Sequence, residues 1–511
     1  MSPSTVLKEL TAIYERVEEC DKDSIKHALA LIEEMTDQLT RFKWLAKQRF
    51  RRSSEKIAPG QLAMAFIEHL AASAQEKPGN DKTANPSPPE SGEPRRKRKS
   101  GIKLLPVETI NKTIPESDRR CECGCTKEHI GCDIRRQIVY QPPKMSIQEE
   151  RLHKYACRPC GAGVVMAEAQ PKLVSGSLAS SSILAHLVVS KVVDSTPIER
   201  VGKQLARHGA SLAPSTLYEW FAYAAKEVAE IQPRIHKELL TSRLISCDDT
   251  PMPTKNAHKN VGIQRGRIWL YLGDIDRIAY CRFSEDWKGV HPRTVLAGFG
   301  GDIQGDGYGG IASLFHGAAS PRRVGCNDHA RRKFVEALKM GDSRAEDIVA
   351  IYAQLYAVER KARDVCAKDR LAMRRTMSQP IWQDLDARIA ALAPLASPKG
   401  PLGKAVTYWR KQKVTLCAYL DSGHLPISNA HVERLLRVVA LLRKNALFMG
   451  SIEAGHRYAA LLTMALNCTL CGADPFAYFS WLFDRLAEGV KGNRALDVLP
   501  QAWLTSQQPA D

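Results

Sequence analysis

Leu425–Lys444 reads LPISNAHVERLLRVVALLRK, and its pattern predicts a helix that begins near Ser428 or Asn429. Apolar residues then recur at steps of three and four, the spacing of one buried helix face: Val432, Leu435, Leu436, Val439 and Leu442. Glu433 lies in the first predicted turn, beside this apolar stripe and among arginines. A carboxylate in that place suits a site for a metal ion and a phosphate. On this stretch alone, a helix-capping residue paired with an arginine is the simpler interpretation.

Size and charge indicate a multidomain protein with a polyanionic partner. The chain has 511 residues, 44% of them hydrophobic, which is enough for several packed cores. It has 74 Lys plus Arg against 56 Asp plus Glu, a formal net charge of +18, so nucleic acid is the expected partner. The first residues are charged and no apolar run is long enough to span a membrane, which predicts a cytoplasmic protein. Its 14 cysteines are then thiols or metal ligands rather than disulfides.

Residues 1–75 are predicted to form an N-terminal helical region. Over residues 21–50 the apolar positions alternate in steps of three and four, as in a coiled coil, although an ordinary amphipathic helix fits the same pattern. A coiled coil would make the protein a homo-oligomer.

Residues 76–105 are rich in Pro, Ser, Glu and Lys and include the basic run Arg95–Lys99. They predict a basic disordered linker that adds phosphate contacts beside a DNA-binding module.

Residues 106–170 contain clustered cysteines that predict a zinc-binding domain. CECGC and CRPCG are two knuckles separated by strand-like segments, one of them Ser146–Tyr155, as in a structural zinc ribbon. The second knuckle has the usual C-x₂-C spacing, and the first is irregular. We expect Zn²⁺ to bind four thiolates, with Cys125 as a substitute in the first knuckle: Cys121, Cys123, Cys157 and Cys160. Four cysteines leave no open position, so the role is structural. Unligated thiols are the alternative.

Residues 171–235 look all-helical and predict a DNA-binding domain resembling a helix-turn-helix. Ile183–Val193 is a predicted buried helix, Pro197–His208 is a second one ended by Gly209, and Ser215–Ala229 is a third. The inner face of the third helix is predicted to contain Leu217, Trp220, Phe221 and Ala224. Two short helices joined by a Gly-containing turn suit a helix-turn-helix, although a plain helical domain fits as well.

Residues 236–450 predict an α/β catalytic domain. Five segments are strand-like: Leu244–Cys247, Arg267–Leu272, Ile278–Phe283, Asp302–Gln304 and Arg322–Cys326. Three antiparallel strands followed by strands that alternate with helices are typical of a ribonuclease-H-like fold. A helical insertion at about residues 342–420 interrupts this domain, and residues 451–511 form a predicted C-terminal helical region. The whole chain is therefore predicted to be multidomain α+β.

Three carboxylates form the candidate catalytic set. Asp248 ends the first predicted strand, Asp306 follows the fourth, and these strands are neighbours in a ribonuclease-H-like sheet. With Glu433 they would repel one another unless cations are present. Such oxygen ligands suit two Mg²⁺ or Mn²⁺ ions, which can hold both oxygens of an in-line phosphoryl displacement. The alternatives are a DNA-binding regulator on an inactive nuclease-like scaffold and a nuclease that only hydrolyses.

Several motifs resemble those of the insertion-sequence-66 family of bacterial DDE-type transposases. FRRSSEK follows the predicted N-terminal helix, and CECGC with CRPCG resembles the family's zinc module. The catalytic-domain motifs are DDTP (248–251), QGDGYGG (304–310), CNDHARRKF (326–334) and PISNAHVERLLRVVALLRKNALFMGS (426–451). The resemblance implies hydrolysis at the ends of an insertion sequence and strand transfer into target double-stranded DNA. It also implies a protein associated with the bacterial nucleoid and small accessory proteins encoded by the same element.

The resemblance also assigns residues. It implies three metal-binding catalytic carboxylates: Asp248, Asp306 and Glu433. Asp249 stands where the family usually has glutamate, and it is a rival ligand at the same edge. Cys326 and His329 fit a C-x₂-H signature and either orient the metal site or pack the fifth strand. Five basic residues are plausible phosphate contacts: Arg331, Arg332, Lys333, Arg434 and Lys444.

Overall fold

The computed structural model describes residues 145–156, 164–255, 262–274, 277–316, 320–490 and 492–507. Within these ranges the protein is a mixed α+β structure. The predicted coiled-coil region, the basic linker and all five cysteines proposed as zinc ligands lie outside the described residues. None of the described helices is long and apolar enough to cross a membrane.

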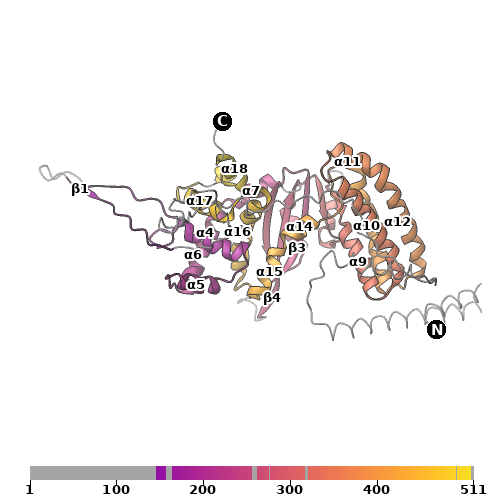
Figure 1. Cartoon of the computed structure of the whole chain (residues 1–511), viewed down its shortest axis with the longest axis horizontal. Coiled ribbons are helices and arrows are strands. Elements are labelled where there is room, and N and C mark those ends of the chain that lie inside the picture. Colours follow the sequence, from indigo (N-terminus) through magenta and orange to yellow (C-terminus); the bar gives the residue numbers. More distant parts are fainter. Residues whose placement is uncertain are drawn as a thin grey trace, which may run out of the picture. The chain divides into compact units, whose positions relative to one another are not determined.

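A five-stranded sheet lies between two groups of helices (Figure 1). Its strand order is β5-β4-β3-β6-β7. The strands are β3 (Leu244–Lys255), β4 (Ile263–Gly273), β5 (Ile278–Ser284), β6 (Asp302–Gly305) and β7 (Arg322–Gly325). The first three form an antiparallel meander, while β6 pairs parallel to β3 and β7 parallel to β6. The predicted order of strands is therefore confirmed.

The prediction that the first strand ends at Asp248 is wrong, because β3 continues to Lys255. β4 pairs with β3 over this whole length, whereas β6 pairs with it only as far as Ser246. Pro251 and Pro253, which have no N–H to donate, lie in the part of β3 beyond β6. Asp248 therefore lies inside a strand, at the point where β3 leaves β6.

One group of helices packs on β3, β4 and β5. It contains α4 (Ser181–Val188), the π-helical turn η3 (Val189–Val193), α5 (Ile198–Arg207), α6 (Pro214–Ala229), α7 (Gln232–Leu239), α16 (Ile452–Cys471), α17 (Pro475–Ala487) and α18 (Pro500–Ser506). α16 contacts β5 and α6, and α17 contacts α4. Residues from the predicted regions 171–235 and 451–511 therefore share one hydrophobic core with the sheet.

The predicted helix Ile183–Val193 is confirmed in position but is not uniform. α4 ends at Val188, and the chain continues as the π-helical turn η3. The predicted inner face of α6 is buried in full: Leu217, Trp220, Phe221 and Ala224. Gly209 separates α5 from α6 with a φ of +91°, a conformation that favours glycine.

Side chains of α16 satisfy the backbone of the edge strand β5. The Ala279 N–H donates to Asn467 Oδ1 at 3.1 Å, and Asn467 Nδ2 donates to the Ala279 carbonyl at 2.9 Å. The Cys281 N–H donates to Thr463 Oγ1 at 3.0 Å. Because these groups are buried, each would be costly if left unpaired. α16 therefore protects the sheet edge that would otherwise be open to another strand.

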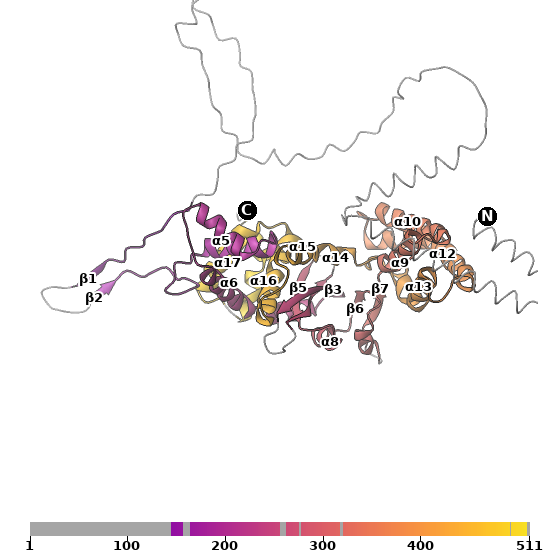
Figure 2. The ribbon, with the colours of Figure 1, turned by 90° about the horizontal axis from the view of Figure 1, so that it is seen from below.

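A second group of helices follows β7 and forms its own hydrophobic core with that side of the sheet (Figure 2). It contains α9 (Asn327–Lys339), α10 (Glu346–Lys361), α11 (Ala367–Met373), α12 (Gln379–Leu392) and α13 (Pro401–Cys417). The predicted apolar face of α10 is buried: Ile348, Ile351, Tyr352, Leu355 and Val358. The helical insertion at residues 342–420 thus follows the last strand of the sheet, β7, and the chain after the insertion returns to contact β3.

The stretch Leu425–Lys444 forms two helices rather than one, α14 (Ala430–Leu435) and α15 (Arg437–Ala446). Leu436 joins them with a ψ of −9°, which tightens the turn there. Both helices contact β3. Of the predicted apolar face, Leu435 is only half-buried, and the other four side chains are buried: Val432, Leu436, Val439 and Leu442.

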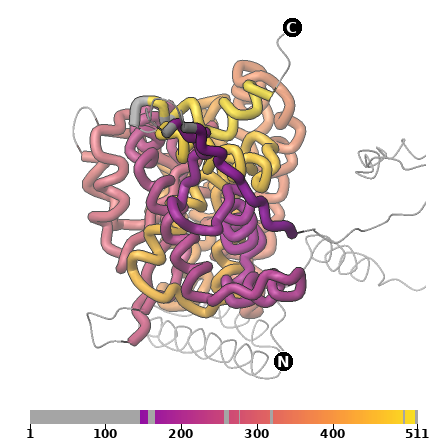
Figure 3. Tube along the Cα trace, turned by 90° about the vertical axis from the view of Figure 1, so that its left-hand side faces the viewer, coloured from indigo at the N-terminus to yellow at the C-terminus, as the bar shows by residue number. Residues whose placement is uncertain are grey.

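The predicted strand Ser146–Tyr155 is largely wrong. Only Lys154–Ala156 forms a strand, β1, which pairs antiparallel with β2 (Val164–Met166). Ile147 is 93% exposed and Tyr155 is 70% exposed, so no buried apolar face supports a longer strand here. Figure 1 shows this pair at the left, away from the helices of the first group, and in Figure 3 it lies in front of them.

Candidate active site

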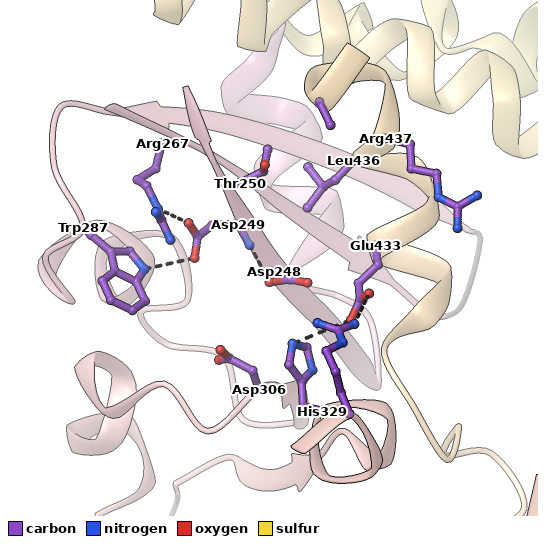
Figure 4. Close-up of a pocket in the computed structure, with 12 residues that line it drawn as sticks. Asp248, Asp249, Thr250, Arg267, Trp287, Asp306, His329, Glu433, Leu436 and Arg437 are labelled. Atoms are coloured by element: carbon purple, nitrogen blue, oxygen red, sulfur yellow. Dashed lines mark hydrogen bonds and ion pairs between the residues drawn. The ribbon is translucent and has the colours of Figure 1, made fainter. Parts of the chain in front are cut away.

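A cleft of about 310 Å³ lies beside the carboxyl end of β6 (Figure 4). It is lined by residues of β3, β4, α9, α14 and α15 and of the segments that follow β5 and β6. The three predicted metal-binding carboxylates all line it: Asp248, Asp306 and Glu433. The structure thus brings together side chains from three separate parts of the sequence.

The strand register places the two aspartates level with each other. Ser246 pairs with Gln304 in the parallel β3–β6 ladder, so two residues further along each strand Asp248 faces the position of Asp306. The Asp249 N–H donates to Asp248 Oδ1 at 2.8 Å, and the Tyr308 N–H donates to Asp306 Oδ1 at 2.9 Å. A backbone N–H from a nearby residue therefore orients each carboxylate, and both side chains still line the cleft.

The rival carboxylate, Asp249, is already paired. Arg267 Nε donates to Asp249 Oδ2, and Trp287 Nε1 donates to Asp249 Oδ1 at 3.0 Å. The Arg267 guanidinium also lies 4.6 Å from the centre of the Trp287 ring. Both oxygens of Asp249 accept from side-chain donors, whereas Asp248 accepts one backbone N–H at Oδ1, so the geometry favours Asp248 as the residue that offers a carboxylate oxygen to a ligand at this edge.

Glu433 reaches the aspartates because the residues before α14 are hydrogen-bonded to the sheet. Asn429 Nδ2 donates to the Cys247 carbonyl at 3.0 Å, and the Asn429 N–H donates to Cys326 Sγ at 3.3 Å. Asn429 occupies the predicted N-cap position, but its side chain makes no capping bond to the helix. These contacts fix the start of α14 to β3 and to the β7–α9 junction, so the helical insertion does not displace Glu433.

The Glu433 carboxylate faces two residues of α9. Arg332 Nη2 donates to Glu433 Oε2 at 2.9 Å, and His329 Nε2 lies 3.7 Å from Oε1. Oε1 is buried and has no hydrogen-bond partner among the described residues. Burial is the main cause that lowers the pKa of His329, although the Glu433 charge acts against it. The predicted pairing of Glu433 with an arginine is thus present, and one carboxylate oxygen remains unbonded.

Comparisons with known proteins decide the family. A family model described as "Transposase IS66 family" matches residues 176–457. The "Uncharacterized protein y4jD" of Sinorhizobium fredii (strain NBRC 101917 / NGR234) is 31% identical over 413 residues, 77% of this chain and 80% of that protein. The chain belongs to the IS66 transposase family.

Two further proteins of the same strain are similar to this IS66-family chain. "Uncharacterized protein y4hP" is 26% identical over 418 residues, 77% of this chain and 75% of that protein. "Uncharacterized protein y4qI" is 27% identical over 458 residues, 86% of this chain and 83% of that protein. No solved structure matches the chain.

The electrostatics of the cleft in this IS66-family chain fit a cation. Burial raises the pKa of Asp248 to about 7, and the negative charges of Asp306 and Glu433 add to the effect, while the Asp249 N–H bond opposes it. Burial also raises the pKa of Asp249, against the bond from Arg267. A carboxyl group that holds a proton near neutral pH beside two other acids exchanges that proton for a metal ion when one binds.

The basic residues predicted to contact phosphate are mostly outside the cleft. Arg332 lines it, but its guanidinium is paired with Glu433. The other four do not line this cleft: Arg331, Lys333, Arg434 and Lys444. Lys333 instead places Nζ 4.8 Å from the centre of the Tyr408 ring. Their contact with phosphate remains a prediction.

Two arginines and one tryptophan in the cleft of this IS66-family chain have no role predicted from the sequence: Arg267, Arg437 and Trp287. Arg437 is exposed and begins α15, only four residues after Glu433 in the sequence. The positions of Arg267 and Trp287 could not be predicted from the sequence, because Arg267 depends on the register of β4 and Trp287 lies in the segment that follows β5. Pro251 pairs with Arg267, which makes Arg267 a diagonal neighbour of Asp249 on the same face.

Proposed function

We propose that this protein is a DDE-type DNA transposase that binds the ends of an insertion sequence, cleaves them and transfers the strands to target DNA. In this proposal Asp248, Asp306 and Glu433 are the ligands of two Mg²⁺ or Mn²⁺ ions. The observation that carries it is the meeting of these three carboxylates in one cleft of an IS66-family chain.

The sheet supports the proposal. Three antiparallel strands followed by two parallel ones, in the order β5-β4-β3-β6-β7, agree with a ribonuclease-H-like catalytic domain. In that arrangement the residues after β6 and in the middle of β3 lie side by side, as the register of these two strands requires. The helical insertion then belongs to the same catalytic domain, between β7 and the helix that carries Glu433.

The donor set of the cleft fits the proposed ions, since carboxylate oxygens are the ligands that Mg²⁺ and Mn²⁺ prefer. Ions of this kind supply polarisation of the phosphate and stabilisation of the attacking and leaving oxygens. The protein's own contribution is to hold the three carboxylates at fixed positions. Arg267 and Trp287 donate hydrogen bonds to both oxygens of Asp249. The hydrogen bonds of Asn429 orient the start of α14. Arg437 adds positive charge where a DNA phosphate would approach.

DNA as the partner is supported by family membership and by the net charge of +18. α5 and α6, joined through Gly209, support a helix-turn-helix-like role for the domain at 171–235. We retain the structural Zn²⁺ of the domain at 106–170, homo-oligomer formation through residues 1–75, and the accessory proteins as parts of the proposal.

The testing experiment is cleavage of labelled element-end DNA with Mg²⁺ or Mn²⁺. Wild type would be compared with Glu433→Gln and with Glu346→Gln, which changes an exposed glutamate in the first turn of another helix, α10. Metal-dependent nicking should persist in Glu346→Gln and disappear in Glu433→Gln, while end binding is retained in both. Asp248→Ala and Asp306→Ala should behave like Glu433→Gln.

Three other outcomes would change the proposal. Near-normal nicking by Glu433→Gln would move the third ligand to another acid. Binding without nicking in every protein, with accessory proteins supplied, would favour the DNA-binding regulator. Nicking without joined products, when a pre-cleaved end and a target are supplied, would favour a nuclease that only hydrolyses.

A further inference from the structure

A second set of ligand atoms lies next to the carboxylate cleft, and its chemistry is different. The Cys326 thiol, a His329 ring nitrogen and a Glu433 carboxylate oxygen all lie within 4.8 Å of one another. Cys326 is buried, while the other two side chains are half-buried. The three residues come from the β7–α9 junction, the first turn of α9 and α14. Glu433 therefore belongs both to a set of oxygen donors and to a set with sulfur and nitrogen.

The backbone positions Cys326 and His329 for a shared ligand. Cys326 directly follows β7 and precedes α9, and His329 is three residues later in the first helical turn, so their side chains lie on one face. The two residues between them have other partners. Asn327 Nδ2 donates to the Leu416 carbonyl at 3.0 Å, and Asp328 Oδ1 accepts from the Tyr356 hydroxyl at 2.6 Å.

Glu433 uses its two oxygens differently. Oε2 accepts from Arg332, whereas Oε1 lies 3.7 Å from His329 Nε2, which is too long for a hydrogen bond. Oε1 and the other ring nitrogen, His329 Nδ1, are both buried without a hydrogen-bond partner among the described residues. Buried polar atoms are normally satisfied, so two unsatisfied ones beside a thiol are suited to bind a cation.

The donor types select the class of ion. Mg²⁺ and Mn²⁺ prefer oxygen ligands, whereas a thiolate, an imidazole and a carboxylate are the ligands of Zn²⁺ and of its usual substitute Co²⁺. Three protein ligands leave one position for water. A thiolate and a carboxylate together neutralise the charge of a divalent ion. Arg332 still donates a hydrogen bond to the second oxygen of Glu433.

We propose that Cys326, His329 and Glu433 bind a Zn²⁺ ion, and that this ion withdraws Glu433 from the carboxylate set and so inhibits DNA cleavage. The proposed binding of Zn²⁺ rests on the geometry of the three ligands alone. The proposed inhibition rests on the proposed function, because it requires Glu433 to take part in DNA cleavage. The protein would then be active only where free zinc is scarce.

Binding is tested with the full-length protein by replacing its metal with Co²⁺. The near-ultraviolet thiolate-to-cobalt band and the Co²⁺ content would be measured for wild type, Cys326→Ser and His329→Gln. Cys366→Ser is the matched control, since Cys366 also stands at the start of a helix and accepts a backbone N–H, from Asp369 at 3.4 Å. The cysteines of the predicted zinc domain are present in all four proteins and cancel in the difference spectra.

We expect both cluster variants to lose one equivalent of Co²⁺ per chain, and Cys326→Ser to lose part of the thiolate band as well. Cys366→Ser should match wild type. If Cys326→Ser and His329→Gln keep the wild-type spectrum and Co²⁺ content, the site does not exist. Circular dichroism of the variants identifies a loss that comes from misfolding, and His329→Gln provides an independent reading if Cys326→Ser does not fold.

Inhibition is tested as a ratio, nicking with added Zn²⁺ divided by nicking without it, at fixed Mg²⁺. With Zn²⁺ at about ten times its dissociation constant, mass action leaves roughly a tenth of the wild-type rate. Cys366→Ser should show the same ratio, and Cys326→Ser a ratio near one. Equal ratios for wild type and Cys326→Ser would refute the inhibition. A protein that binds Co²⁺ through Cys326 but never nicks would refute the proposed function and leave the metal site standing.

Discussion

Asp248 makes the stability of the metal-free protein depend on pH in an unusual direction. Its pKa is raised from an ordinary 3.8 to about 7 by burial and by three neighbouring acids, Asp306, Glu433 and Asp249. Between these two pH values the folded protein holds a proton that the unfolded chain has released. Raising the pH therefore favours unfolding over this range, and the destabilisation is complete above pH 7 and absent below pH 4. Asp248→Asn, which cannot ionise, removes this dependence.

The size of the effect follows from the pKa. A change from 3.8 to about 7 corresponds to an upper limit of about 4 kcal/mol, since each pKa unit is ~1.4 kcal/mol. Water in the open cleft screens the carboxylate, so we expect about half of this limit, ~2 kcal/mol. In chelator at pH 8, Asp248→Asn should thus be more stable than wild type by roughly that amount, while at pH 4 the two should be similar.

The assay is urea unfolding in chelator at several pH values from 4 to 8, with wild type, Asp248→Asn and Asp302→Asn. Asp302 is a suitable control because it lies at the start of β6, where its carboxylate accepts from Arg322 Nε at 2.7 Å. Its variant should follow the pH profile of wild type. If the free energies of unfolding of Asp248→Asn and wild type changed in parallel with pH, the raised pKa of Asp248 would be refuted. A variant less stable than wild type at pH 8 would refute it as well.

Three further predictions test other parts of the molecule. Asn429→Ala removes the side-chain donor to the buried Cys247 carbonyl, so urea unfolding should show a loss of about 1–3 kcal/mol in the free energy of unfolding. DNA cleavage should fall more than DNA binding, and unchanged cleavage would contradict the role of Asn429 in placing Glu433. Arg437→Gln should lower the salt dependence of DNA binding by about one released counterion, whereas Arg485→Gln on α17 should not; equal slopes would remove Arg437 from the DNA path. Freshly purified protein should contain zinc that Cys157→Ser reduces, and a zinc-free preparation would refute the zinc domain.

The strands and the three carboxylates were predictable because their signals are local. β-branched and aromatic runs predict β4 and β5, and an acid directly after the short strand β6 predicts Asp306. The length of β3 was not predictable, because its second half depends on pairing with β4 rather than on its own residues. The break at Leu436 is likewise absent from the apolar period, which continues smoothly through both helices.

The partners of the carboxylates were harder to predict because they come from distant parts of the chain. Arg267 reaches Asp249 only through the register of two strands, and Glu433 meets His329 only after the helical insertion has returned to the sheet. The C-x₂-H spacing of Cys326 and His329 was visible in the sequence, but its closeness to Glu433 was not. The structure places these residues against the candidate site, so packing of the fifth strand is not their only contact.

The contact between α16 and β5 has a consequence for protein synthesis. The ribosome makes the sheet and its acidic residues well before α16, because Thr463 and Asn467 come more than a hundred residues after the strand whose backbone they satisfy. A truncated product without α16 would expose an apolar strand with free N–H groups, which promotes aggregation between copies. Premature termination before α16 should therefore yield insoluble protein that quality-control proteases degrade, rather than a soluble fragment.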